Sequence, residues 1–357
     1  MKIYIKFITF TYLKSLFYVF LIMLSLVFIL NILTELEFFK DTKVSLFFTL
    51  LLSLINSPSM IFEMSPFIML IGIQLFFIKL FENQEIEIFK YSGLKNIKIL
   101  QILSILTILI GIFTITIFYS ISSNLKNIYL EMKSDYAVDG KYLAVVTKNG
   151  LWIKDKINNK IIITNSSSIE NNFILNNFIT EFDENFNVVR NIKSKKIDIS
   201  KNKWQILNAR IYEKNNYTNK KNLEIQTNFN LERIKTLYSN LAALNIYELW
   251  DLRTNYKKLN YSIIDIDLHI FKLLSHPIYL LLIGIFSSLI MFNLKKYKGS
   301  TSKILTGLFF SVIIYYINNF SYVLGETEKI SLITSILIPL IILFTLNSLM
   351  IFRINEK

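Results

Sequence analysis

The sequence contains no cysteine, and this absence removes whole classes of chemistry. Disulfide bonds, thiolate catalysis and cysteine-based metal sites are all excluded. The chain has only two histidines, His269 and His276, and the nearby residues offer too few further ligands for a metal site. We therefore expect both histidines to be interfacial or packing residues.

The common catalytic motifs are also missing. The sequence has no phosphate loop of the form G-x-x-x-x-G-K-[ST], no H-E-x-x-H zinc motif and no nucleophile elbow. This chain is therefore not expected to hydrolyse ATP or cleave peptides by these routes. No catalytic residue, metal or cofactor of its own is predicted.

Apolar residues are abundant. They make up 53% of the 357 residues, with only 9 Gly and 4 Pro, while 18% of the residues are charged. This composition is too apolar for an ordinary soluble protein and too charged for one wholly inside a membrane, so two parts are predicted. The net charge of +13 comes from scattered lysines, many of which flank apolar runs. Membrane topology explains these lysines better than nucleic-acid binding does.

Six apolar runs are predicted to span a bilayer, which takes about 20 residues of helix. They cover residues 7–33, 61–80, 99–120, 271–293, 304–324 and 330–352. The first run is too long for a signal peptide and no small-residue cleavage site follows it, so it is interpreted as an uncleaved span. Residues 35–43 are interpreted as a polar loop. The apolar tract that begins at Val44 is interpreted as an approach helix at the outer surface.

The orientation follows from the basic residues, which fall on one side if six spans alternate. They are Lys2, Lys6, the segment 90–98, the loop 295–303, Arg353 and Lys357. The positive-inside rule makes that side the cytoplasm. Both ends of the chain are then cytoplasmic, and the segment between the third and fourth spans lies outside, in a bacterial periplasm if the cell is Gram-negative.

That outer segment is predicted to be a folded β-rich insert. Short β-branched runs separated by turn signals predict strands over residues 142–147, 151–154, 160–165, 173–182, 187–192, 195–199, 204–212 and 223–227. Asn149 and Gly150 favour a type I′ hairpin turn, because both positions of that turn need positive φ. Trp152 follows in the same hairpin. A sandwich, a jelly roll or an open barrel would fit such strands.

A helix is predicted after the strands. Asn245 is a suitable N-cap, and Glu248 three residues later completes a capping box. The predicted domains are residues 1–121 with three spans, 122–240 with a jelly-roll-like β fold, 241–268 as a helical connector and 269–357 with three more spans.

Residues 82–98 form a short polar segment between the second and third spans. Glu82, Glu85 and Glu87 precede Lys90, Lys95 and Lys98, an order that complements a helix dipole, and Gly93 suits a helix end. Ile86 and Phe89 are three apart and share a helical face that would dock into another protein. A solvated turn explains the segment equally well.

Three cations stand at the outer rim, where the positive-inside rule does not place them. They are Lys40, Lys43 and Lys272. An anionic lipid headgroup would explain their position. Snorkelling of lysine at a helix end explains it equally well.

Several motifs resemble those of one family. The segment 85–95, EIEIFKYSGLK, is similar to the pattern E-L-x-A-L-R-A-S-G-V-S, with Glu85, Ser92 and Gly93 retained and Ile86, Phe89 and Lys90 conservatively matched, whereas Tyr91 and Lys95 depart from it. The segment 150–154, GLWIK, resembles a G-[LV]-W-[IL]-[RK] hairpin. Lys272 with Pro277, and then Gly307 and Pro339, fit the last three spans. Together they resemble the LptF/LptG (YjgP/YjgQ) permease family of the lipopolysaccharide export ABC transporter over essentially the whole chain, and the hairpin with Gly150 and Trp152 is typical of the LptG branch.

The resemblance implies a fold and a set of partners. The fold is a six-span, three-plus-three α-helical membrane protein of the bacterial inner membrane with an inserted periplasmic jelly-roll-like domain. The chain would be a half-transporter, not an enzyme, that pairs with an LptF-like permease subunit. An LptB-like ATPase dimer would bind the ATP. Lipopolysaccharide would be drawn from the membrane and passed through the β domain to LptC-like and LptA-like bridge proteins.

The resemblance also implies residue roles. Glu85, Ile86, Phe89, Lys90, Ser92 and Gly93 would couple the chain to the ATPase, with Phe89 filling a pocket on it. The three outer-rim lysines would face lipid A phosphates.

Other readings remain open. The chain would also fit a membrane anchor for a β-rich binding module without transport activity, although one span would serve that purpose. It would fit a permease for another lipid. A lipoprotein-release or MacB-like permease would have four spans with the outer domain after the first. A secondary transporter is disfavoured, because no acidic residue falls in the core of a predicted span.

Overall fold

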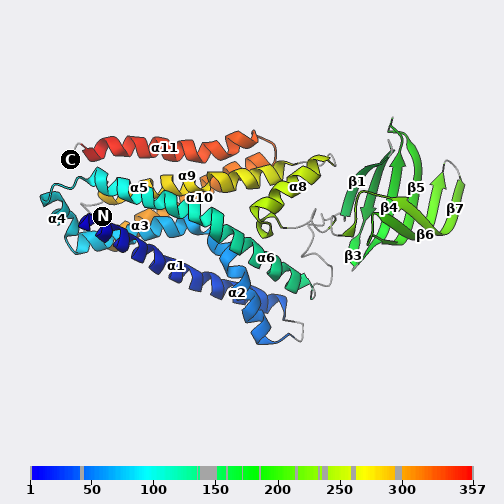
Figure 1. Cartoon of the computed structure of the whole chain (residues 1–357), viewed down its shortest axis with the longest axis horizontal. Coiled ribbons are helices and arrows are strands. Elements are labelled where there is room, and N and C mark those ends of the chain that lie inside the picture. Colours follow the sequence, from blue (N-terminus) through cyan, green and yellow to red (C-terminus); the bar gives the residue numbers. More distant parts are fainter. Residues whose placement is uncertain are drawn as a thin grey trace. The chain divides into compact units, whose positions relative to one another are not determined.

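The chain folds into two compact units. The computed structural model describes residues 2–40, 44–134, 136, 151–157, 160–170, 172–184, 186–213, 216–231, 234, 240–258, 263–293 and 300–355. The helical unit comprises Met1–Lys126 and Ile264–Lys357, and the β insert comprises Asn127–Ile263 (Figure 1).

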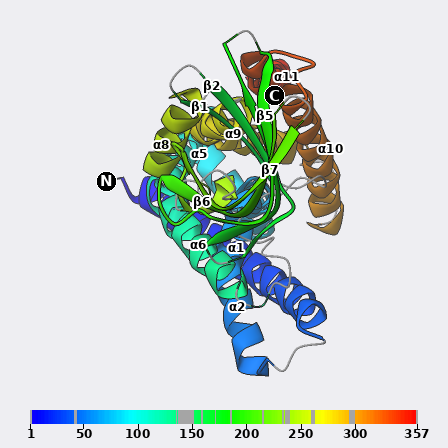
Figure 2. The same ribbon diagram turned by 90° about the vertical axis from the view of Figure 1, so that its right-hand side faces the viewer.

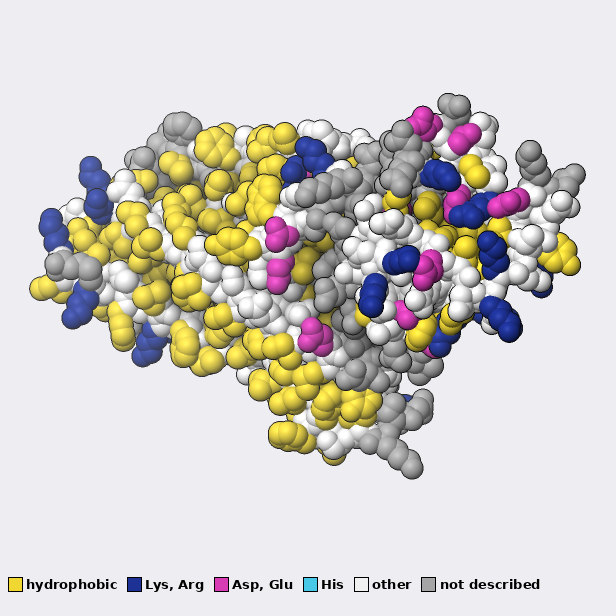
Figure 3. All heavy atoms as spheres, turned by 45° about the vertical axis from the view of Figure 1, so that its right-hand side comes forward, with side chains coloured by type: hydrophobic (Ala, Val, Ile, Leu, Met, Phe, Trp, Pro, Cys, Tyr) yellow, Lys and Arg dark blue, Asp and Glu magenta, His cyan; other side chains and the backbone are white. Residues whose placement is uncertain are grey.

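Long helices build the helical unit. Before the insert they are α1 (Ile3–Phe38), α2 (Leu46–Glu63), α3 (Ser65–Glu82), the short α4 (Glu85–Tyr91) and α5 (Asn96–Phe113), which continues through a π-helical turn (Thr114–Phe118) into α6 (Tyr119–Ser134). After the insert they are α9 (Ile264–Asn293), α10 (Ser300–Glu326) and α11 (Leu332–Asn355). Hydrophobic side chains cover the face of this unit drawn in Figure 3, and Lys and Arg gather at one end of it.

Seven described helical segments are long and apolar enough to cross a membrane. They include the six predicted spans and also α2, which the sequence had indicated as an approach helix. Length and composition alone therefore admit a seventh span, and the count of six stays a prediction.

Helix α1 is longer than the sequence indicated. Its 36 residues extend about 54 Å, well beyond the thickness of a bilayer core. The interpretation of residues 35–43 as a loop is wrong at its start, because no Gly or Pro interrupts the chain before Phe38 and the helix continues. Glu35 is therefore helical, and its side chain is only 1% exposed.

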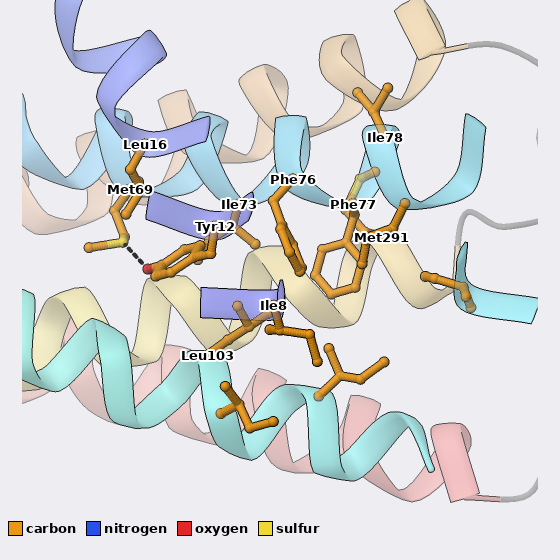
Figure 4. Close-up of a cluster of buried hydrophobic side chains, with 14 of the residues drawn as sticks. Ile8, Tyr12, Leu16, Met69, Ile73, Phe76, Phe77, Ile78, Leu103 and Met291 are labelled. Atoms are coloured by element: carbon orange, nitrogen blue, oxygen red, sulfur yellow. Dashed lines mark hydrogen bonds between the residues drawn. The ribbon is translucent and has the colours of Figure 1, made fainter. Parts of the chain in front are cut away.

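The main core of the helical unit surrounds Tyr12 of α1 (Figure 4). Its hydroxyl lies 3.1 Å from Sδ of Met69 in α3 and 2.9 Å from Oγ1 of Thr107 in α5. The Tyr12 ring meets Phe76 edge-on, with 6.0 Å between ring centroids. One polar group thus joins three helices inside an otherwise apolar core.

Two glycines allow other helices to approach closely. A Cβ on Gly111 of α5 would lie 2.8 Å from Cα of Pro277 in α9. A Cβ on Gly307 of α10 would overlap the side-chain amide of Gln74 in α3. Gln74 is fully buried, and neither of its amide atoms has a hydrogen-bond partner among the described residues. Small residues at crossings are the usual means of packing helices in lipid.

The β insert contains one antiparallel sheet. Its strands are β1 (Leu151–Ile157), β2 (Lys160–Ser166), β3 (Ser168–Glu170), β4 (Phe173–Phe182), β5 (Val188–Asp198), β6 (Lys203–Glu213) and β7 (Asn216–Gln226). They pair in the order β1-β2-β4-β5-β6-β7, with β3 added beside β4. The order follows the chain, so the described strands form a curled meander (Figure 2).

The short strand β3 was not predicted, and two further strand predictions differ from the structure. The runs 187–192 and 195–199 form the single strand β5, and β7 begins at Asn216 instead of residue 223. The predicted strand 142–147 and the turn at Asn149 and Gly150 lie outside the described residues.

A line of irregular pairing explains why β5 looked like two strands. Asn176 in β4 and Asn208 in β6 have φ of 50° and 49°, a conformation that asparagine tolerates better than most residues. Every second residue of a strand is buried, but at this line two exposed or half-buried residues follow each other. The next buried residue after Ile174 in β4 is Asn177, and the next after Ile206 in β6 is Ala209. Ser194 of β5 bridges the line by donating to the carbonyl of Leu207 at 2.6 Å. The sheet bends there without losing its register.

One carboxylate ties the first strand to the residues after the last. Asp155 of β1, which is 3% exposed, accepts hydrogen bonds from Oγ1 of Thr227 and from N and Nδ2 of Asn228, all within 2.9 Å. Phe229 beside them is fully buried, and its carbonyl accepts from Nε1 of Trp204 at 2.7 Å. This segment closes the apolar core of the curled sheet.

Helix α8 (Ile246–Lys258) confirms the predicted capping box. Oδ1 of Asn245 accepts from N of Glu248 at 3.1 Å, and Oε2 of Glu248 accepts from N of Asn245 at 2.8 Å. Leu249 and Leu252 are buried on the inner side of the helix. A 3₁₀ turn, Leu241–Ala243, precedes it.

Replacing Gly307 by Ala should weaken the bundle. The new methyl group overlaps the Gln74 amide, and overpacking of this kind costs about 1 to 3 kcal/mol. Thermal unfolding of the purified chain in detergent measures the loss. The double variant Gly307→Ala with Gln74→Ala should recover part of it, because the obstructing side chain is gone. A double variant no more stable than Gly307→Ala would contradict the proposed contact.

Replacing Asp155 by Ala should destabilise the β insert. It leaves the Thr227 hydroxyl and the Asn228 donors without their acceptor, a loss of about 2 to 4 kcal/mol. Denaturant unfolding followed by tryptophan fluorescence reports it, because Trp204 is buried in the same core. Asp198→Ala is the control, since Asp198 at the end of β5 accepts its described hydrogen bonds from nearby Ser200, two residues further along the chain. Equal losses in the two variants would contradict the special role of Asp155.

Candidate functional site

Helix α4 connects α3 to α5 and has defined ends. It begins after Gln84, whose φ is 58°, with Glu85 and Glu87 in its first turn and Lys90 in its last. At its end, N–H of Gly93 donates to the carbonyl of Lys90 at 3.0 Å and N–H of Leu94 donates to that of Phe89 at 2.8 Å. This is a Schellman motif, which needs positive φ at Gly93, and the observed value is 78°. The segment is therefore a helix with a fixed stop.

One face of α4 packs into the chain itself. Ile86 is 2% exposed and belongs to the core that surrounds Tyr12. Phe89 is half-buried against the same core and meets Phe7 of α1 edge-on, with 6.1 Å between centroids. The expectation that Ile86 and Phe89 present a docking face to another protein is corrected for Ile86, because its side chain is enclosed by the chain's own helices.

The opposite face of α4 is exposed and partly apolar. Ile88 is 61% exposed and Tyr91 is 90% exposed, and the two are three positions apart. Lys90 and Ser92 are exposed beside them, and Oγ of Ser92 donates to the carbonyl of Ile88 at 2.8 Å. Glu85 is partly buried, and its Oε1 accepts from Nδ2 of Asn83 at 3.4 Å. An exposed apolar pair on a rigid helix suits a protein contact.

The core under α4 draws on most of the bundle. Besides Tyr12 and Ile86 it includes Phe77 of α3, Ile99 of α5 and Met291 of α9. Phe77 meets Phe292 with 4.8 Å between ring centroids. Helix α4 therefore shares one packed core with α1, α3, α5 and α9.

The outer-rim lysines are not brought together by any described contact. Lys272 of α9 places Nζ 5.1 Å from the ring centroid of Tyr322 in α10, a cation–π contact. Lys40 is exposed just after α1. Lys43 lies outside the described residues.

A polar cluster between α1, α2 and α6 was missed from the sequence. Nδ2 of Asn56 donates to Oδ1 of Asn31 at 3.1 Å, and Nζ of Lys126 donates to Oδ1 of Asn56 at 2.6 Å. Asn31 also donates to Oγ of Ser57 at 3.2 Å. Buried Glu35 follows Asn31 by one turn of α1. The four-residue spacing of Asn31 and Glu35 places both on one face of a helix and could have indicated this cluster. It was overlooked because the first span was predicted to end before Glu35 and residues after 121 were assigned to the insert.

Both histidines are hydrogen-bonded within the bundle. Nε2 of His269 lies 3.0 Å from the hydroxyl of Tyr119. Nε2 of His276 lies 3.0 Å from Oγ of Ser65, and its ring stacks on Phe62 with 5.0 Å between centroids. Because the Ser65 hydroxyl donates to the carbonyl of Phe62, His276 donates to Ser65. The described residues contain no group of acidic and histidine side chains that could hold a metal ion.

The remaining predicted site residue, Trp152, lies on β1 opposite Asn165 and is 53% exposed.

Membrane-capable helices on both sides of a β-rich insert, with a short capped helix anchored between two of them, fit a membrane permease. The family comparison agrees. Residues 6–353 match the lipopolysaccharide export system permease LptF/LptG, so the chain belongs to this family of permeases and is not itself the catalytic component. A search of curated proteins found no match.

The two faces of α4 should respond differently to truncation. Ile86→Ala should lower the free energy of unfolding by about 2 to 5 kcal/mol, because it opens a cavity in the core. Ile88→Ala should change it by no more than about 0.5 kcal/mol, since that side chain is exposed. Thermal unfolding in detergent compares the two. A larger effect at Ile88 would contradict the orientation of the helix.

Proposed function

We propose that this chain is one transmembrane half of an ABC exporter that draws lipopolysaccharide from the bacterial inner membrane. Membership of the permease family supports this reading. The structural observation that supports it most is the arrangement of α4. One side of this helix carries the exposed pair Ile88 and Tyr91, and the other side packs through Ile86 into the core of the helical unit. That arrangement is what an ATPase needs in order to move the spanning helices.

The ATPase contact is assigned to the exposed face of α4. Ile88 and Tyr91 fill a groove on an LptB-like ATPase, and Lys90 lies beside them to orient the contact. Ile86 and Phe89 transmit the motion inward. In this arrangement the polar segment faces the cytoplasm, and ATP is bound by the partner alone.

The outer-rim lysines and the β insert contact the lipid. A second LptF/LptG subunit completes the cavity, and this chain takes the LptG position, as its GLWIK hairpin favours. Lys40, Lys43 and Lys272 offer cations to lipid A phosphates. The periplasmic β insert passes the lipid to LptC-like and LptA-like proteins, with an edge strand extending a neighbouring sheet.

The test is co-purification of the tagged chain from its native membrane. The wild type should bring down a nucleotide-binding subunit and a second permease subunit. Tyr91→Asp should lose the nucleotide-binding subunit alone, because a charge replaces the outermost apolar contact of α4. Tyr91 is a better target than Phe89, since a charge at the half-buried Phe89 would also disturb the fold.

Tyr247→Asp is the matched control, because Tyr247 is 85% exposed on α8. It should retain both partners. Recovery of no nucleotide-binding subunit with the wild type would remove the energy source of the exporter and favour the non-transporting anchor.

A further inference from the structure

The outward face of the β insert carries a row of aromatic and basic residues. The pairing register sets Trp152 opposite Asn165, Asn165 opposite Phe178, Phe178 opposite Lys193, Lys193 opposite Arg210, and Arg210 opposite Asn219. These residues therefore form one continuous row across β1, β2, β4, β5, β6 and β7. Lys195 and Lys221 are exposed two positions further along β5 and β7, and so extend it on the same face. We call these eight residues the basic face.

Acidic residues are absent from the described part of this face. The next row, Lys154, Ile163, Thr180, Asn191, Tyr212 and Tyr217, also contains none. The acidic side chains of the sheet lie elsewhere. Asp155 and Glu181 are buried on the other face. Beyond the bend, Glu224 forms an ion pair with Lys203, and hydrogen bonds from Ser200 lower the pKa of Asp198. Glu170 is exposed on β3 beyond the bend, and Glu213 is exposed at the end of β6. The two rows described here therefore carry no acidic side chain.

The centre of the basic face places two like charges together. Lys193 and Arg210 are direct partners on neighbouring strands, and both are exposed. Like charges directly opposite each other destabilise a sheet. An anion bound between them would remove this repulsion, so the pair costs stability only while the site is empty.

Arg210 is held ready for such an anion. Its Nε donates to Oδ1 of Asn219 at 3.4 Å, and its guanidinium lies 5.8 Å from the ring centroid of Tyr217. Both contacts favour one orientation of the guanidinium. A fixed guanidinium fork matches the geometry of phosphate oxygens, and neighbouring lysines add point charges.

The aromatic residues in the same row narrow the class of ligand. Phe178 is 42% exposed beside Lys193, and Trp152 is 53% exposed two strands further away. Exposed rings provide flat apolar surface, and the adjacent cations provide phosphate contacts. A ligand that carries both ring surfaces and phosphates uses the whole row, whereas free phosphate uses only its basic end.

We propose that the basic face binds a phosphorylated glycan. On the proposed function, on which this assignment of the source rests, the glycan is the sugar headgroup of the exported lipid. Lys193 and Arg210 hold its phosphate, and Phe178 and Trp152 contact its sugar rings. The headgroup thus travels along the outside of the insert.

The test uses the full chain in an uncharged detergent. The probe is a phosphorylated core oligosaccharide freed of its acyl chains, and binding is measured by calorimetry. The wild type should bind it with an affinity that falls as salt rises. The double variant Lys193→Gln with Arg210→Gln should bind at least about tenfold more weakly, because two charge-assisted contacts are lost. Its unfolding temperature without ligand should change little, because the repulsion that it removes offsets the lost contacts of Arg210 with Asn219 and Tyr217.

Lys203→Gln is the matched control. Lys203 lies on the same strand as Arg210, but beyond the bend and paired with Glu224. This variant should bind like the wild type. Wild-type affinity in the double variant, or equal weakening in the control, overturns the proposal.

Two further probes separate the sources of phosphate. If inorganic phosphate at the same concentration displaces the glycan completely, or a dephosphorylated glycan binds equally well, the glycan assignment is wrong. If anionic vesicles without sugar retain the wild type and the free glycan does not bind, the face contacts a membrane instead. Glycan binding that persists when co-purification finds no ATPase would overturn the exporter and leave the basic face standing.

Discussion

The contacts that hold the helices together in lipid also hold α4 in place. Apolar surface gives no advantage there, because lipid tails are as apolar as the side chains, so close packing and internal hydrogen bonds must supply the specificity. The Tyr12 hydroxyl between Met69 and Thr107 is the clearest such contact in the bundle. Ile86 of α4 belongs to the same core. The small helix is therefore rooted where the spanning helices are joined most specifically.

The β insert has to exclude water from its core. In the described pairing order β1 and β7 are the outermost strands, so the curled sheet needs a contact that closes the core between its edges. Asp155 does this by accepting hydrogen bonds from Thr227 and Asn228, while Phe229 fills the interior. The sheet bends along the line through Asn176 and Asn208. The ion pair of Glu224 with Lys203 lies beyond this line, away from the basic face.

Local signals were readable from the sequence and long-range ones were not. The capping box at Asn245 and Glu248 was predicted because both partners lie within four residues. The strand β4 was predicted with its bounds for a similar reason. The burial of Ile86 was missed because an apolar helical face has the same sequence pattern whether it packs against the chain's own helices or against a partner protein. The continuity of β5 was missed because a change of parity within a strand looks like a turn.

Helix α4 shows how the two kinds of information combine. The conservative apolar matches to the family pattern, Ile86 and Phe89, are the side chains that pack inward, where the fold of the bundle restricts them. Ile88 and Tyr91 stand where that pattern has Ala, and both are exposed. If the proposed ATPase contact is right, the groove that receives them is wider than one shaped for Ala. The inner face of α4 is fixed by packing within the chain, whereas its outer face meets no such restriction.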